Sequence, residues 1–166
     1  MKAKLLPIFK QLFIVIAVVV VIGQWQSRHL PSGDAPLSQV RNLVGERYSL
    51  PEKRQATLFY FFAPWCGVCR LSMANLNSIQ DWFPKFSVKA VALDFESEDE
   101  IKKFASDVGL RVPIYLGDES VRTLWNVNAY PTYVVVDANG TVRAASVGYS
   151  SQFGMILRVI WTKLFA

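Results

Sequence analysis

The chain has 166 residues, enough for one domain with a hydrophobic core, and 52% of them are hydrophobic. The formal net charge is +5, but three of the basic residues lie among the first ten, and without them 15 basic and 13 acidic residues remain, scattered along the chain. Such a small and dispersed charge gives no indication of a nucleic-acid-binding protein.

The N-terminal segment is the most hydrophobic part of the chain. Residues Leu12–Gly23 contain no polar side chain, and three lysines and no acidic residue precede them. The stretch from Leu5 to Trp25 extends about 31 Å as a helix, at about 1.5 Å per residue. This length is enough to cross a hydrocarbon core of about 30 Å. Residues 1–25 are therefore predicted to form an uncleaved membrane anchor.

The same segment has a second interpretation as a cleaved signal peptide. The uninterrupted apolar run is short, as in signal peptides, but no A-x-A cleavage site follows it. Under either interpretation the lysines stay in the cytoplasm and the rest of the chain is exported. We therefore expect a single-pass protein of the inner (cytoplasmic) membrane, with its N-terminus inside and its C-terminal domain in the periplasm or another extracytoplasmic space.

The polar residues 26–36 contain two prolines and a glycine, which is typical of a linker, and residues 37–166 are expected to form the folded domain. Within that domain, one continuous apolar run predicts a strand buried on both faces. In chain order, the predicted elements are two short extended pieces within Leu43–Lys53, that buried strand (Ala56–Phe62), a helix that opens at or near Cys66, a strand (Ser87–Phe95), a capped helix (Ser97–Leu110), an extended piece (Val112–Asp118), a short helix (Glu119–Val127), a hairpin (Thr132–Gly148) and a closing helix (Ser151–Ala166).

This order of elements predicts an α/β fold. Strands of the buried, parallel type alternate with helices, and then an antiparallel hairpin around an Asn-Gly turn and a final helix follow. The closing helix has apolar residues at i, i+3 and i+4 spacing and is expected to pack on the sheet, with contact to the membrane as the alternative. We therefore expect a central mixed β-sheet flanked by helices.

The chain has two cysteines, Cys66 and Cys69, separated by two residues. A zinc site needs four ligands, and the only histidine, His29, lies in the expected linker. A copper(I) site could use the two thiolates alone. A structural disulfide would close a very small loop and stabilise little. The remaining interpretation, a redox-active dithiol, is the one that the position of the pair favours.

Cys66 lies at the predicted turn from a strand to a helix. Backbone N–H groups are unpaired at a helix start and the helix dipole is positive there, and both features favour a thiolate. Cys69 follows about one turn later, close enough to form a disulfide, and is expected to act as the resolving thiol. We therefore predict thiol–disulfide exchange with these two catalytic cysteines, in an exported compartment where such exchange has substrates.

The stretch FFAPWCGVC and, further along, NAYPTYVVVDANGTV resemble the thioredoxin superfamily. The N-terminal anchor, Gly45 and Ser49-Leu50 before the first core strand, and an inserted helix and short strand at about residues 97–116 are more similar to its membrane-anchored TlpA/ResA/DsbE-like branch. Within that branch, the chain is most similar to the ScsD-like protein disulfide oxidoreductases. The resemblance covers about residues 36–166. It implies a thioredoxin-like fold, protein thiol or disulfide substrates, a membrane-embedded redox partner, and chemistry that needs no bound cofactor or metal ion.

The resemblance also implies roles for the residues around the cysteines. Pro131 is expected to be in the cis form and to face the disulfide, and Tyr130 to present its backbone to a substrate peptide and line the groove. Trp65 is expected to shield Cys66 and to offer an apolar contact to partners. The residues themselves leave two alternatives open: a trans Pro131 at an edge strand, and a Trp65 that packs in the core.

The sequence departs from the family at the positions of two acidic residues. Tyr60 replaces the buried acid of thioredoxin, and Ser72 replaces a glutamate common in ResA-like proteins, so that no general base for the second cysteine is identified. Asp94, which ends a strand, is expected to face solvent. Gly67-Val68 supplies no histidine between the cysteines, and Arg70 is expected to help a thiolate only modestly. Because a strong oxidant needs a strongly stabilised reduced form, we expect a weakly to moderately reducing couple.

A copper-binding or copper-delivery module that uses the same cysteine pair is the alternative function. Thioredoxin folds with that function usually add a distant ligand histidine within the domain. The single histidine of this chain lies before the expected domain, which argues against the alternative.

Overall fold

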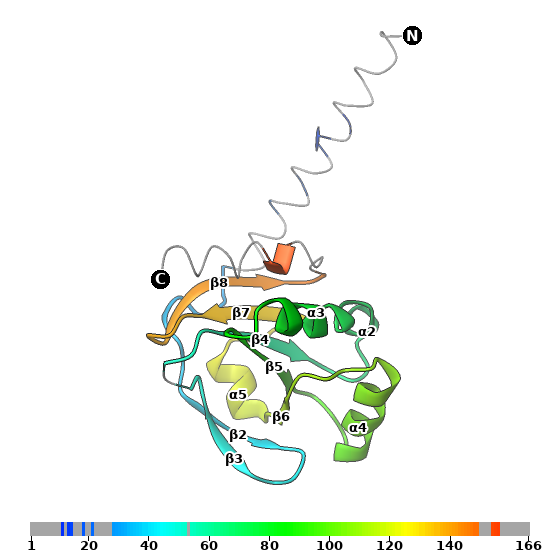
Figure 1. Cartoon of the computed structure of the whole chain (residues 1–166). Coiled ribbons are helices and arrows are strands. Elements are labelled where there is room, and N and C mark those ends of the chain that lie inside the picture. Colours follow the sequence, from blue (N-terminus) through cyan, green and yellow to red (C-terminus); the bar gives the residue numbers. More distant parts are fainter. Residues whose placement is uncertain are drawn as a thin grey trace.

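The computed structural model of the chain describes residues 28–52, 54–149 and 154–156, and five single residues closer to the N-terminus, 11, 13, 14, 18 and 21. The described part is built on an eight-stranded sheet with helices on both faces (Figure 1). The strands are β1 (Gly33–Asp34), β2 (Ser38–Asn42), β3 (Arg47–Leu50), β4 (Thr57–Phe62), β5 (Ser87–Ala92), β6 (Ile114–Leu116), β7 (Thr132–Val136) and β8 (Thr141–Val147). The helices are α2 (Gly67–Ser72), α3 (Ala74–Trp82), α4 (Glu98–Asp107) and α5 (Glu119–Leu124).

The sheet is mixed, as the sequence predicts. Its strand order is β1-β8-β7-β4-β5-β6-β2-β3, in which β4, β5 and β6 are parallel and the other neighbours are antiparallel. Parallel strands end at the same edge of a sheet, and β7, which runs antiparallel to β4, begins at that edge. The loops that follow β4, β5 and β6 and the loop that precedes β7 therefore gather at one edge of the sheet, and the cysteines lie there.

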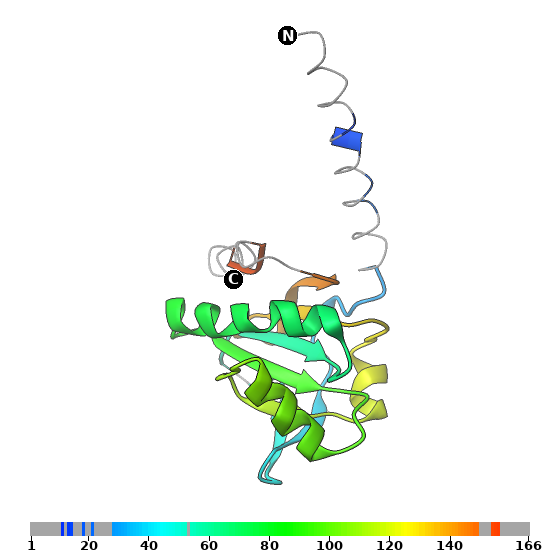
Figure 2. The same ribbon diagram turned by 90° about the vertical axis from the view of Figure 1, so that its right-hand side faces the viewer.

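Strand β4 is the centre of the core, because all six of its residues are buried. Its side chains alternate between the two faces of the sheet. Tyr60 and Phe62 pack with α2, α3 and α4, whereas Phe59 and Phe61 pack against Trp125 at the end of α5. Figure 2 shows α5 on the opposite side of the sheet from α3 and α4. The prediction of a strand buried on both faces is confirmed.

The expected linker, residues 26–36, includes part of the sheet. Strand β1 pairs with β8, and the Ala35 N–H donates to the Gly140 carbonyl at 2.8 Å. This part of the expected linker therefore belongs to the folded domain, which begins before residue 37. The first of the two extended pieces also begins earlier than predicted, because β2 starts at Ser38.

The single helix predicted after the cysteines is divided into α2 and α3 at Met73. At this point the Leu76 N–H donates to the Met73 carbonyl at 3.1 Å, in a tighter three-residue turn. Helix α4 begins where the capping-box spacing predicts, since the Ser97 hydroxyl accepts from the Glu100 N–H. The Glu100 carboxylate accepts from the N–H of Glu96, one residue before the cap.

The expected membrane anchor, residues 1–25, lies outside the described residues except for the five single positions. Among the described residues, no helix has the length and apolar character needed to cross a membrane. The closing helix also lies largely outside the described residues. Its residues 154–156 are helical, and Met155 is buried in the core on the α3 side of the sheet.

Candidate active site

Cys66 and Cys69 form a disulfide at the edge of the sheet where β4 ends. Cys66 is the N-cap residue of α2: its backbone is extended (φ −78°, ψ 105°), and its Sγ accepts a hydrogen bond from the Cys69 N–H at 3.1 Å. The N–H groups at a helix start lack intrahelical partners, and here a sulfur atom supplies an acceptor. The prediction that the helix opens at Cys66 is confirmed.

The two sulfur-bearing residues differ in their access to solvent. Cys66 is 6% exposed, whereas Cys69 is completely buried. An incoming thiolate or disulfide therefore meets Cys66 first. The N–H group that contacts its Sγ would also stabilise a thiolate at that position. Because the rate of thiol–disulfide exchange depends on access to the sulfur that is attacked, this difference favours reaction at Cys66.

A pair of hydroxyl groups lies in the core beneath Cys69. The Tyr60 and Ser72 oxygens are 2.8 Å apart, and both side chains are buried. Ser72 donates to the Val68 carbonyl at 3.0 Å, and Tyr60 reaches the Cys69 carbonyl at 3.3 Å. Burial, and then the neighbouring Tyr133, raise the pKa of Tyr60 far above its ordinary value. The two positions at which the family resemblance leads us to expect acids are thus in direct contact and hold hydroxyl groups.

Arg70 of α2 makes its contacts with α4. Its guanidinium lies 4.7 Å from the centre of the Phe104 ring and 3.4 Å from the Asp107 carboxylate, both on α4. Hydrogen bonding from Lys103 and then from Arg70 lowers the pKa of Asp107. The arginine charge is therefore already paired on the side of the molecule that carries α4.

Trp65 and Tyr130 lie together beside the disulfide. Trp65 is 66% exposed, so the alternative that it packs in the core is wrong. The two rings meet edge to face, with centroids 5.6 Å apart and an interplanar angle of 81°. The peptide bond between Tyr130 and Pro131 is cis, as the resemblance implies, and the alternative of a trans proline is wrong. The structure therefore brings these three expected residues to the edge of the sheet that carries the cysteines.

Asp94 is exposed, as expected, and it also contacts both of these aromatic residues. Its main-chain carbonyl accepts a hydrogen bond from Trp65 Nε1 at 3.0 Å, and its carboxylate accepts one from the Tyr130 hydroxyl at 2.9 Å. Sequence reasoning missed this role. The available signal was the position of Asp94 after a parallel strand, because side chains at the carboxyl ends of such strands meet at one edge of the sheet.

The described residues offer little to a metal ion. Among them, no group of three or more histidine, cysteine, aspartate or glutamate side chains is placed to hold one. His29, expected in a free linker, lies beside the end of α5, where its carbonyl accepts a hydrogen bond from the Asn126 side chain.

The fold and the site together define a thioredoxin-like thiol–disulfide oxidoreductase. The class is given by a mixed sheet, a disulfide across a helix start at the end of β4, and a cis proline immediately before β7. The chain matches the AhpC/TSA family over residues 31–145, and it belongs to that family of thioredoxin-like proteins.

Individual relatives agree with this assignment. The chain is 31% identical to the thioredoxin-like protein YneN of Bacillus subtilis over 118 residues, which cover 69% of each chain. It is 29% identical to the thiol-disulfide oxidoreductase ResA of Geobacillus kaustophilus over 117 residues, which cover 69% of this chain and 67% of the relative. A crystal structure from Chlorobium tepidum, described as a thiol:disulfide interchange protein DsbE, matches with a TM-score of 0.73 and 25% identity over 80% of this chain and 98% of that chain. The predicted similarity to ResA- and DsbE-like proteins is confirmed.

Proposed function

We propose that this chain is a membrane-tethered thiol–disulfide oxidoreductase that exchanges disulfides with protein substrates in an extracytoplasmic compartment. The observation that carries the proposal is the disulfide at the start of α2, in which Cys66 is partly accessible and Cys69 is buried. Cys66 is the nucleophile and Cys69 is the resolving thiol.

In the reducing direction, the reaction begins from the dithiol form. The Cys66 thiolate attacks one sulfur of a substrate disulfide, a bond forms between the two sulfurs, and the substrate disulfide breaks. The leaving substrate thiolate takes a proton from solvent. Cys69 then loses its proton and attacks Cys66 Sγ, which releases the second substrate thiolate. The protein ends with the Cys66–Cys69 disulfide, and two electrons have passed to the substrate; oxidation of a substrate dithiol is the same sequence reversed.

Trp65, Tyr130 and Pro131 are proposed to bind the substrate segment around its cysteine. Trp65, next to Cys66 in sequence, and two exposed side chains of the helix that Cys66 caps, Val68 (43% exposed) and Leu71 (75% exposed), provide apolar contact area. Exposed aromatic residues of this kind are common anchors of protein interfaces. A partner of this surface is therefore an apolar, extended protein segment that contains a cysteine.

The reducing direction is proposed from the surroundings of the cysteines. A strongly oxidising couple requires a reduced form that is strongly stabilised. Here the Tyr60–Ser72 pair beneath Cys69 is neutral, and Arg70 is paired with Asp107 on α4. The thiolate at Cys66 therefore depends on the backbone N–H groups of the helix start, which favours a weakly to moderately reducing couple over a strong oxidant.

The membrane tether is proposed from the N-terminal segment. Residues 1–25 form the anchor, with the N-terminus in the cytoplasm, and a short linker leads to the thioredoxin-like domain, which extends to residue 166. The described apolar residues of the segment support this assignment, since Phe13, Ile14, Val18 and Val21 are each at least 50% exposed. Such apolar side chains are stable in lipid and costly in water.

Electrons are exchanged with a second, membrane-embedded partner.

Trapping of substrates tests the proposal. Full-length protein with Cys69→Ser keeps the nucleophile but cannot resolve a mixed disulfide, so we expect covalent adducts that disappear on reduction. The matched control is Cys66→Ser, which retains only the buried cysteine and should form none. If Cys69→Ser traps no protein in cells, while the purified wild-type protein carries copper by mass spectrometry, the oxidoreductase assignment is wrong and a copper-binding module replaces it.

A further inference from the structure

The backbone of Asp94 has a conformation that non-glycine residues rarely adopt. Its φ is +48°, in the left-handed region, where aspartate is among the residues that are tolerated. The residue lies two positions beyond the end of β5, at the same edge of the sheet as the cysteines. In this conformation, the carbonyl oxygen and the carboxylate of one residue are both available to side chains from other loops.

These two acceptors hold side chains from two separate loops. Trp65 comes from the loop after β4 and donates to the Asp94 carbonyl, and Tyr130 comes from the loop before β7 and donates to the Asp94 carboxylate. The contact between the two rings closes the arrangement, so that each of the three residues touches the other two. The orientation of each aromatic ring is therefore constrained both by Asp94 and by the other ring.

Arg122 of α5 lies near the same carboxylate oxygen that Tyr130 contacts. Its Nε lies 3.8 Å from the carboxylate of Asp94, while the guanidinium also bonds the Val127 carbonyl and pairs with Glu119. Burial, and then the hydrogen bond to Asp94, raise the pKa of Tyr130 above its ordinary value, so the phenol stays protonated and remains a donor. Through Arg122, the arrangement of Trp65, Asp94 and Tyr130 is connected to α5.

We propose that Asp94 is a positioning residue for disulfide exchange, which fixes Trp65 and Tyr130 in one arrangement beside Cys66 and so pre-forms the surface that a protein substrate contacts. The inference rests on the proposed function, because it concerns the binding of that substrate. Side chains that are already ordered do not have to be ordered when a partner binds, and this lowers the cost of association. Asp94 itself touches neither sulfur and takes no part in the bond exchange.

The test compares a protein substrate with a small disulfide. Full-length protein, reduced beforehand, reacts with insulin, which needs the whole contact surface, and with cystamine, which needs little beyond the Cys66 sulfur. The readout is the ratio of the two second-order rate constants. In Asp94→Gly the left-handed backbone and the carbonyl are retained and only the carboxylate is lost. We expect the ratio to fall about three- to tenfold, as for the loss of one hydrogen bond.

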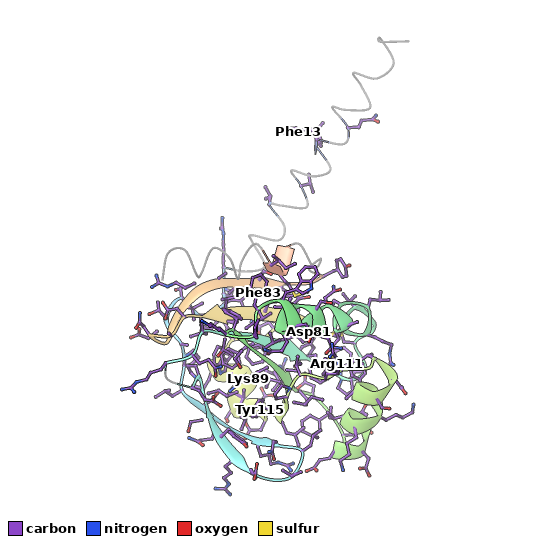
Figure 3. All side chains as sticks on the ribbon, viewed as in Figure 1. Phe13, Asp81, Phe83, Lys89, Arg111 and Tyr115 are labelled. Carbon is purple, nitrogen blue, oxygen red and sulfur yellow. A yellow bond between two sulfur atoms is a disulfide. The ribbon has the colours of Figure 1, made fainter. Side chains whose placement is uncertain are left out.

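Three further variants separate positioning from a general loss of structure. Asp94→Asn keeps an acceptor oxygen for Tyr130 and tolerates the left-handed backbone, so it should restore most of the ratio. Tyr130→Phe removes the donor and should lower the ratio as much as Asp94→Gly, and the double variant should show no further loss. The control is Asp81→Ala, which removes an exposed carboxylate on α3 that pairs with Arg111 at 2.6 Å (Figure 3) and should leave the ratio unchanged.

The outcomes are distinguishable. If wild-type protein reduces neither substrate, the proposed function fails. If wild-type protein is active and Asp94→Gly slows insulin and cystamine equally, or slows neither, the positioning role is wrong. Additive losses in Asp94→Gly and Tyr130→Phe would also overturn it, because they would show that the two side chains act separately.

Discussion

Replacing Tyr60 with phenylalanine removes one oxygen atom from the core beneath the disulfide. Two groups that contact the Tyr60 hydroxyl keep another hydrogen-bond partner. Ser72 still donates to the Val68 carbonyl at 3.0 Å, and the Cys69 carbonyl still accepts from the Met73 N–H at 2.9 Å. Because Ser72 and the Cys69 carbonyl each keep one partner, we expect the loss of the hydrogen bond between the hydroxyls to cost about 1 kcal/mol of unfolding free energy. The buried Tyr133 side chain also contacts Tyr60, and its response adds to this cost.

The partner variant, Ser72→Ala, follows the same reasoning. The Tyr60 hydroxyl keeps the Cys69 carbonyl at 3.3 Å as an acceptor, so we expect another loss of about 1 kcal/mol. The double variant removes the shared bond only once, and its loss should fall short of the sum by about 0.5–1 kcal/mol. Urea unfolding at constant slope measures this, since about 1 kcal/mol shifts the midpoint by roughly 0.5 M.

A matched control is available on an exposed helix face. Ser106→Ala on α4 makes the same chemical change at an exposed position and should leave the urea midpoint nearly unchanged. Strictly additive losses in the two single variants would refute the reasoning, because they would show that the 2.8 Å contact between the hydroxyls contributes no coupling. A loss of more than about 3 kcal/mol in Tyr60→Phe would show that a buried group is left unpaired.

Further predictions concern the hairpin, the core and the helix start. Burial raises the pKa of Asp137, but hydrogen bonds from the Thr141 N–H, Arg143 and the Asn139 N–H outweigh it, so the folded-state pKa is lowered. The ionised Asp137 carboxylate therefore stabilises the folded protein above the unfolded pKa of about 3.9, and this stabilisation is lost as pH falls through the lower folded pKa. The unfolding free energy of the wild-type protein should decrease between about pH 5 and 3, and in Asp137→Asn this decrease should be smaller. Gly117→Ala should cost about 1–2 kcal/mol in urea unfolding, because the added Cβ would lie 2.7 Å from Leu93 Cδ2, whereas Gly67→Ala meets no atom within 4 Å and should not destabilise the protein. Cys66→Ser replaces the sulfur acceptor at the N-cap with an oxygen acceptor and should preserve the helical circular dichroism, while disulfide reduction falls to background.

Local sequence patterns predict the parts of this fold that depend on neighbouring residues. The apolar run that contains Phe59 and Phe61 predicts a strand buried on both faces, and the Cys66 turn predicts the helix start. Pairings between distant residues leave no local pattern. Strand β1 is two residues long and exists only because β8 pairs with it, and the sequence therefore suggests a linker there.

The same limit applies to the site. The cysteines are found by their spacing, and Trp65 and Pro131 are found through the resemblance to the thioredoxin superfamily. The contact between Tyr60 and Ser72 depends on how α2 packs on β4, twelve residues apart in sequence, and the position of Asp94 depends on three loops that meet at one edge of the sheet. The absence of acids at 60 and 72 is visible in the sequence, but the hydroxyl pair that replaces them is visible only in the structure.

The reduction potential of the cysteine pair is the most direct test of the central claim that Cys66 and Cys69 form a reducing exchange couple. Full-length protein is equilibrated with glutathione buffers of graded ratio, and the fraction of free thiol is measured by alkylation and mass spectrometry. We expect a reversible two-electron transition between about −200 and −280 mV, the range of glutaredoxins and thioredoxin. A potential near about −120 mV, as in the strong oxidant DsbA, would contradict the reducing direction. A pair that does not titrate reversibly would contradict the exchange function itself.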